Sequence, residues 1–176
     1  MQLTPTARVI LGMIRMGKRT GYDIKQLVDV STRFFWAASY GQIYPELNRL
    51  ERLGLVESKL APTGARKRKE YELTPAGRRA LAEWAAAPAR MPELRDENLL
   101  KLFFADLIPA ADALEQLRMR RAGHEEFLAF LRQIEVRPEE EPRFVDLVLQ
   151  YGIEYAEWNI AWCRKHERRL ARKEAA

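Results

Sequence analysis

The chain has little of what metal sites and covalent cross-links require. Its 176 residues include one cysteine and two histidines, and His124 and His166 stand far apart, without the close ligand spacing of a zinc site. Cys163 has no second cysteine with which to form an internal disulfide, which favours a reducing, cytoplasmic location. We therefore expect neither a metal site nor another cofactor.

Long apolar runs and catalytic motifs are also missing. The apolar stretches are far shorter than the roughly 20 residues that a membrane helix needs, and residues 1–5 do not resemble a secretory signal. There is no glycine-rich phosphate-binding loop and no GxSxG nucleophile motif. Carboxylates of the second half, such as Glu125 and Asp146, have no nucleophile or histidine beside them, so we expect no enzymatic activity and no membrane association.

Charge is divided unevenly along the chain. Residues 1–90 contain 16 Lys and Arg against 8 Asp and Glu, whereas residues 91–176 contain 14 against 17. A basic first half favours a polyanionic partner, although basic residues also serve simply to solvate a surface. Hydrophobic residues make up 47% of the chain, which excludes an intrinsically disordered protein.

Helix signals dominate the first half. Thr4 and Thr74 each precede a proline, the pattern of an N-cap followed by the first helical residue. Another helix is expected from about Thr20, and a third from Ser39 to Gly54, where Ser39 and Gln42 have capping-box spacing. Pro45 falls in the second turn of that third helix, which predicts either a local bend or a start nearer Tyr44.

Strand signals separate the third helix from the fourth. Residues 55–60 and 69–73 alternate in polarity as short strands do, and residues 61–68 between them form a basic, turn-rich loop. Three helices, a hairpin with a basic tip and a fourth helix follow one another in the order of a winged helix-turn-helix. We therefore predict a winged helix-turn-helix domain over residues 1–87.

The second half is predicted to be all helical. Prolines mark residues 88–95 as a linker, and helices are expected over 96–107, from Pro109 to about Val136, and over 143–169. Residues 96–176 would form a helical domain for dimerisation and effector binding. The predicted fold is thus mostly α with one small β-hairpin.

The third helix carries the residues that would read DNA. The N-terminal part of such a helix enters the major groove, where glutamine can pair with adenine and neighbouring hydroxyls can bind phosphates. An ordinary solvated helix face would show similar residues. Our candidates on this helix are Ser39, Tyr40, Gln42, Tyr44, Asn48 and Arg49.

Two further groups would bind the DNA backbone. Thr20, Tyr22 and Lys25 stand at the start of the second helix, where helix amides and side-chain donors can meet a phosphate. Arg66, Lys67, Arg68 and Lys69 are four consecutive cations, predicted at the hairpin tip. Each phosphate that they neutralise would steepen the salt dependence of binding by about 0.9 in log–log slope.

The last helix carries an aromatic stripe with alternating spacings of four and three residues. One interpretation is that the stripe packs on neighbouring helices of the same chain; the other is a seam between two copies. With two aromatic residues of an earlier helix, the stripe could also bind a planar aromatic acid, or form solid core. The residues concerned are Phe103, Phe104, Phe144, Val148, Tyr151, Tyr155, Trp158 and Trp162.

Three segments closely resemble the PadR family of bacterial transcriptional regulators. They are GYDI at residues 21–24, SYGQIYPELNRLERLGL at residues 39–55 and YELTPAG at residues 71–77. The helical remainder, with KLFF at residues 101–104, is similar to the longer C-terminal domain of some members. The four cations at residues 66–69 are denser than the family pattern requires.

The resemblance implies a homodimer that reads a pseudo-palindromic operator in double-stranded DNA. It also implies regulation, mostly repression that a small and often aromatic effector relieves. Two recognition helices must then lie about 34–36 Å apart to enter successive major grooves. The alternative is a helical interaction protein whose winged domain binds protein or RNA, since a fold alone does not determine a function.

Overall fold

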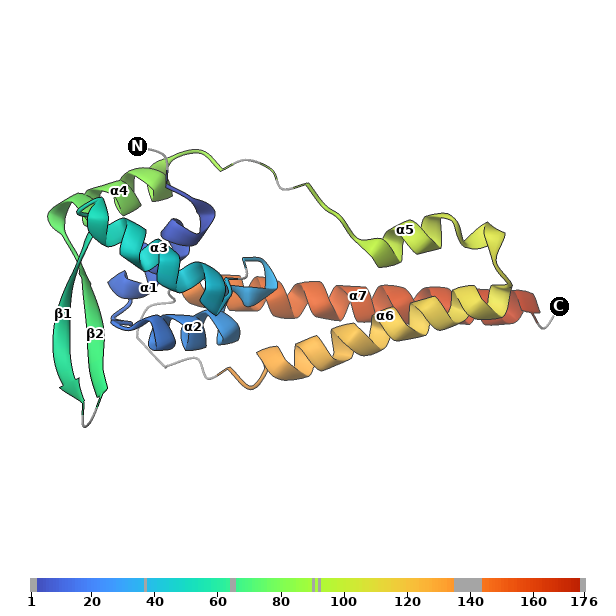
Figure 1. Cartoon of the computed structure of the whole chain (residues 1–176). Helices are drawn as coiled ribbons and strands as arrows, with labels where there is room; N and C mark the ends of the chain where they lie inside the picture. Colours follow the sequence, from blue (N-terminus) through green and yellow to red (C-terminus); the bar gives the residue numbers. More distant parts are fainter. Residues whose placement is uncertain are drawn as a thin grey trace. The chain divides into compact units, whose positions relative to one another are not determined.

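The computed structural model describes residues 3–36, 38–63, 66–89, 91, 93–134 and 144–174. The chain divides into two compact units, which we call the N-terminal unit (Met1–Met91) and the C-terminal unit (Pro92–Ala176). Helices dominate both units, and the two strands form one antiparallel hairpin (Figure 1). The predicted fold class, mostly helical with a small hairpin, is confirmed.

The described part of the N-terminal unit consists of four α-helices, a short 3-10 helix and the hairpin. Thr4 caps α1 (Pro5–Arg15), Thr20 caps α2 (Gly21–Val30) and Thr74 caps α4 (Pro75–Ala86), each by accepting a backbone N–H. Between α2 and α3 (Tyr40–Arg52) lies the short 3-10 helix η1 (Thr32–Phe34). Gly17 and Gly54 follow α1 and α3 with positive φ, which ends both helices where the sequence predicts.

The hairpin is longer than the sequence predicts. Strand β1 spans Val56–Thr63 and β2 spans Arg66–Leu73, so the expected basic loop over residues 61–68 is largely paired strand. Pro62 stands opposite Lys67 in the ladder. A proline is compatible with this position because both strands of a two-stranded sheet are edge strands.

The core of the N-terminal unit lies between the apolar faces of its helices and the base of the hairpin. Helices α1, α2 and α3 contact one another, and α4 packs on α1 and on β2. The residues whose side chains are fully buried include Ile10, Leu11, Ile24, Val28, Ile43, Leu47, Leu50 and Val56. This core leaves the opposite face of α3 at the surface.

The C-terminal unit is built on a helical hairpin. Helices α6 (Ala110–Leu131) and α7 (Phe144–Glu174) run antiparallel along one another (Figure 1), and α5 (Glu97–Phe103) contacts α6. Among the described residues, no helix is both long enough and apolar enough to cross a bilayer.

Two helix predictions need correction. The helix expected over residues 96–107 is α5 followed by the 3-10 helix η2 (Ala105–Leu107), because the α-helix ends at Phe103 and Phe104 is its C-cap. Helix α3 begins at Tyr40 and continues through Pro45, so a start nearer Tyr44 is wrong. A proline in the second turn lacks an N–H for the bond to Gly41, and the rest of the helix tolerates this loss.

Candidate nucleic-acid interface

One face of α3 is available to a large partner. Ile43 and Leu47 are fully buried against the core, whereas Ser39, Gln42, Tyr44 and Asn48 are exposed on the other side. These four are among the residues predicted to meet DNA. The side chain of Tyr40, also predicted, lies outside the described part of the structure.

The start of α3 is capped by one of its own predicted base-reading residues. Gln42 Oε1 accepts hydrogen bonds from Ser39 N–H at 3.0 Å and from Ser39 Oγ at 3.4 Å. Pairing with adenine N6 and N7 uses both the amide oxygen and the amide nitrogen of a glutamine. Gln42 would therefore release this cap on binding such a base.

Tyr44 rests on the first residue of α2. A Cβ atom at Gly21 would come within 2.6 Å of Tyr44 Cε1, so the tyrosine ring lies directly on the glycine. On the adjacent surface Tyr22 is exposed, and its hydroxyl accepts a hydrogen bond from Gln26 Nε2 at 2.7 Å. Two tyrosines that are predicted to contact DNA therefore lie on α2 and α3, the helices expected at a DNA groove and beside it.

Three other residues that are predicted to contact DNA already have partners within the chain. Thr20 is buried, and its hydroxyl accepts the Asp23 N–H and donates to Asp23 Oδ2, so a contact with a phosphate, which stays a prediction, would have to displace these bonds. The Lys25 side chain, only 14% exposed, is paired with Asp29. Arg49 donates to Glu46 Oε1 at 2.8 Å, which binds its guanidinium along α3 itself.

Two of the four hairpin cations also have carboxylate partners. Arg68 Nη2 lies 2.8 Å from both carboxylate oxygens of Asp23 and 2.7 Å from Thr20 Oγ1. Lys69 Nζ lies 3.0 Å from Glu51 Oε2. Both cations lie within β2 and not at the hairpin tip, which corrects the prediction; the side chains of Arg66 and Lys67 lie outside the described part.

The Lys69–Glu51 pair alters the titration of both groups. Hydrogen bonds from Ser58 and then from Lys69 lower the pKa of Glu51 below its ordinary value. The hydrogen bond to Glu51 raises the pKa of Lys69. Both groups are therefore charged at neutral pH.

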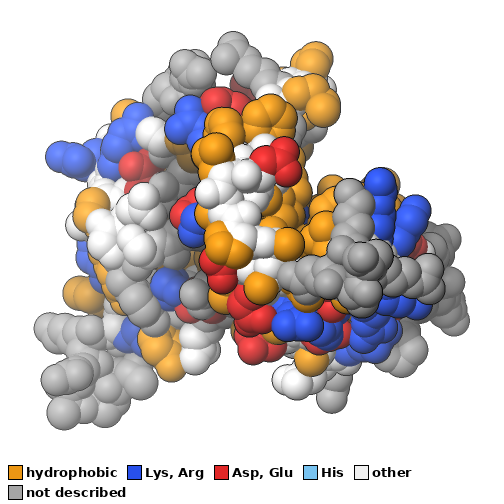
Figure 2. Space-filling view, turned by 90° about the vertical axis from the view of Figure 1, so that its right-hand side faces the viewer, with side chains coloured by type: hydrophobic (Ala, Val, Ile, Leu, Met, Phe, Trp, Pro, Cys, Tyr) orange, Lys and Arg blue, Asp and Glu red, His pale blue; other side chains and the backbone are white. Residues whose placement is uncertain are grey.

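A second surface, on α7, is apolar and exposed. Phe144, Tyr151 and Trp158 are 87%, 70% and 62% exposed, whereas the other face of the helix buries Ala156, Ile160 and Cys163. Packing of the whole stripe within its own chain is therefore wrong, although Tyr155 touches His124 and Trp162 touches His166. Phe103 and Phe104 are exposed as well, and hydrophobic side chains lie between charged ones on the face drawn in Figure 2.

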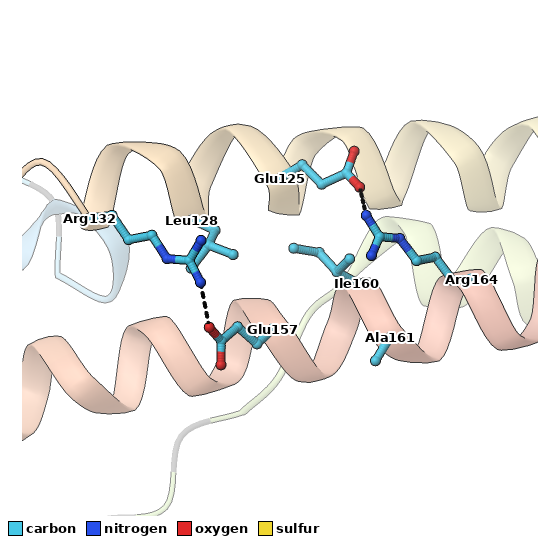
Figure 3. Close-up of a pocket in the computed structure, with 7 residues that line it drawn as sticks. All are labelled: Glu125, Leu128, Arg132, Glu157, Ile160, Ala161 and Arg164. Atoms are coloured by element: carbon cyan, nitrogen blue, oxygen red, sulfur yellow. Dashed lines mark hydrogen bonds and ion pairs between the residues drawn. The ribbon is translucent and has the colours of Figure 1, made fainter.

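The groove between α6 and α7 has a different lining from the predicted effector site. It measures about 490 Å³ and is crossed by two ion pairs, Arg132–Glu157 at 2.7 Å and Arg164–Glu125 at 2.8 Å (Figure 3). Leu128, Ile160 and Ala161 complete its lining. None of the aromatic residues proposed for an effector is among these residues.

Sequence reasoning missed a buried polar cluster in the C-terminal unit. Arg120, almost fully buried, donates to Asp96 Oδ2 at 2.8 Å and to Asn159 Oδ1 at 2.9 Å. Burial raises the pKa of Asp96, but hydrogen bonds from Leu99 N–H and Arg120 outweigh this effect and lower it overall. The one sequence feature that points toward this cluster is the position of Asp96 directly before α5, and that position by itself indicates only a helix cap.

Each of the two units matches the model of a known protein family. Residues 10–83 match the model of the transcriptional regulator PadR-like family, and residues 94–171 match that of the virulence activator alpha C-terminal domain. Each matched range lies wholly within one compact unit.

Individual proteins of known sequence or structure are also similar. The negative transcriptional regulator PadR of Bacillus subtilis is 34% identical over 119 residues, which span 64% of this chain and 65% of that protein. "Probable transcriptional regulator Rv1176c" of Mycobacterium tuberculosis is 30% identical over 161 residues, covering 81% of this chain and 85% of the relative.

Solved structures resemble the whole chain. B. subtilis PadR in complex with operator DNA has a TM-score of 0.83 at 26% identity, covering 93% of this chain and 98% of that one. The same protein in complex with p-coumaric acid has a TM-score of 0.76 at 25% identity, covering 95% and 96%.

Proposed function

Because the chain belongs to the PadR-like family of transcriptional regulators, we propose that it binds operator DNA sequence-specifically as a homodimer. The observation that carries this proposal is the exposed face of α3, with Gln42, Tyr44 and Asn48 on a helix whose other side is core. A single α-helix of this kind fits the major groove of B-DNA.

The described contacts divide the DNA-binding work among three elements. Gln42 and Asn48 present amide groups to base edges from α3. The hydroxyls of Ser39, Tyr22 and Tyr44 suit phosphate oxygens on either side of the groove. Arg66 and Lys67, which precede the paired cations of β2, are proposed to neutralise phosphates at the outer part of the hairpin.

Dimerisation is assigned to the α7 stripe. Its exposed aromatic side chains, together with Phe103 of α5 and Phe104 directly after it, offer roughly 800 Å² of surface, taking about 200 Å² for a whole aromatic side chain and scaling that area by the exposed fraction of each residue. A stable interface buries about 800 Å² on each partner. A second copy of the chain would thus bury a surface that is otherwise unusually apolar for a monomer.

The regulatory part of the proposal is repression relieved by a small aromatic acid. The support is the p-coumaric acid complex of the B. subtilis relative. Quenching of tryptophan fluorescence by a panel of phenolic acids tests it, and a flat response to the whole panel would contradict it. A regulator that must reach DNA is proposed to work in the cytoplasm, and catalysis forms no part of the proposed role.

The DNA-binding proposal is tested by selecting bound duplexes from a random pool and comparing the selected duplex with a scrambled one in gel shifts. We expect clear preference for the selected duplex, reduced by Tyr44→Ala. Lys67→Ala should lower the log–log salt slope by about 0.9, and Lys101→Ala, a lysine of α5 in the C-terminal unit, should leave it unchanged. Equal affinity for both duplexes, or preference for RNA, would favour the alternative of an RNA- or protein-binding winged domain.

A further inference from the structure

Two carboxylates lie beside the proposed DNA-binding surface, where a polyanion would repel them. Asp23 is in the first turn of α2 and Glu51 is near the end of α3, the two helices of the helix-turn-helix. Each is bound to a cation of the same hairpin strand, Asp23 to Arg68 and Glu51 to Lys69. Because DNA phosphates repel carboxylates, we expect these two residues to have a role other than direct contact with DNA.

The two pairs attach the strand on both of its sides. Arg68 and Lys69 are neighbours in β2, and consecutive residues of a strand point to opposite faces. Arg68 accordingly meets α2 and Lys69 meets α3. Further along the strand, Tyr71 N–H donates to Arg19 O at 2.7 Å, next to the start of α2.

Among the side chains that the structure describes, apolar packing is confined to the base of the hairpin. Val56, Tyr71 and Leu73 are buried at its base, but Leu60, which stands opposite Lys69, is 62% exposed. A two-stranded hairpin without apolar support is only marginally stable in water. Beyond the base, the described contacts between hairpin and helices are therefore polar ones.

We propose that Asp23 and Glu51 are positioning residues for DNA recognition: through Arg68 and Lys69 they hold the hairpin at a set angle to α2 and α3. The inference rests on the proposed function. The hairpin then presents Arg66 and Lys67 to phosphates in register with α3. Without the carboxylates, Arg68 and Lys69 lose the charged partners that direct them toward the helices, and the hairpin loses its register.

The test compares two aspartates of α2 that undergo the same change of charge. Asp23→Asn removes the carboxylate bound to Arg68 of the hairpin, whereas Asp29→Asn removes the carboxylate bound to Lys25 within the same helix. Affinities for the selected and the scrambled duplex are measured over a salt series, and thermal unfolding verifies that each variant is folded. An exposed pair contributes up to about 1 kcal/mol, which corresponds to about fivefold in affinity.

For Asp23→Asn we expect the ratio of selected to scrambled affinity to fall about three- to fivefold, with a steeper salt slope on the scrambled duplex. Asp29→Asn should keep the wild-type ratio, and Asp23→Glu should restore it. In an Arg68→Ala background Asp23→Asn should change nothing further, because Asp23 acts through Arg68. Equal ratios for Asp23→Asn and Asp29→Asn would overturn the inference while leaving the proposed function intact; a wild-type protein without preference would overturn both.

Discussion

Replacing Gly77 with alanine should severely destabilise the N-terminal unit. Gly77 lies in the first turn of α4, and a Cβ atom there would stand 1.9 Å from the backbone oxygen of Leu55 and 2.9 Å from its carbonyl carbon. The nearer contact must lengthen to at least 3.0 Å, a displacement of about 1 Å between two backbone segments. Backbone cannot yield as a flexible side chain does.

The Leu55 oxygen is itself held in place. It accepts hydrogen bonds from Thr74 N–H at 3.1 Å and from Thr74 Oγ1 at 3.2 Å. Separation of the two segments weakens these hydrogen bonds, which lowers the free energy of unfolding by about 1 kcal/mol for each bond. The remaining steric strain lowers it by about a further 1–3 kcal/mol. Alanine recovers up to about 1 kcal/mol of helix propensity. The net loss in free energy of unfolding is about 3 kcal/mol.

Gly12 provides the matched control, since it lies within α1 of the same unit and a Cβ atom there meets nothing within 4 Å. Gly12→Ala should stabilise the unit by about 0.5–1 kcal/mol. In thermal unfolding followed by circular dichroism, Gly77→Ala should lower the midpoint by roughly 12–24 °C, since about 4–8 °C corresponds to 1 kcal/mol in a domain of this size. A Gly77→Ala midpoint equal to or above that of the wild type would refute the reasoning.

Three further predictions follow from the contacts described above. Gly21→Ala should push the Tyr44 ring off α2 and weaken binding of the selected duplex severalfold in gel shifts, with a small loss of stability; unchanged binding would mean that the ring position is unimportant. Trp158→Ala should raise the dimer dissociation constant by at least about tenfold in analytical ultracentrifugation, since large buried aromatics dominate interfaces, and an unchanged constant would place the interface elsewhere. Asp96→Asn leaves Arg120 buried without its carboxylate and should reduce the stability of the C-terminal unit by about 2–3 kcal/mol at neutral pH. Because the pKa of Asp96 is lowered on folding, its contribution is complete above its ordinary value of 3.8 and is lost as the pH falls through the folded value; the variant should therefore unfold with a flatter acid dependence in urea titrations below about pH 4.

The predictions that succeeded depend on short stretches of chain. Thr4 before Pro5 and Thr74 before Pro75 are caps in the structure, and the positive φ of Gly54 ends α3 at the predicted place. A cap joins residues three apart, and the apolar periodicity of a helix repeats within two turns. Such features are complete within a few residues and can be recognised before the fold is known.

The predictions that failed concern how side chains are shared between elements. Arg68 and Asp23 are 45 positions apart, so the sequence shows two surface charges where the structure has an ion pair. Thr20 is a polar residue of a type that is usually exposed, yet packing around the start of α2 buries it. The aromatic residues of α7 are of the types that usually fill a hydrophobic core, yet most of them are exposed in the single chain.

The sequence by itself determined the order of the elements, the ends of most helices, the winged-helix architecture and the family, since these follow from local backbone preferences and short motifs. Only the tertiary structure decided which charges remain available to a partner: it pairs Arg68 with Asp23, Lys69 with Glu51 and Arg120 with Asp96. The reason is geometric. An ion pair acts over a few ångströms, and separate helices and strands reach that distance only after the packing of their apolar faces has set their positions.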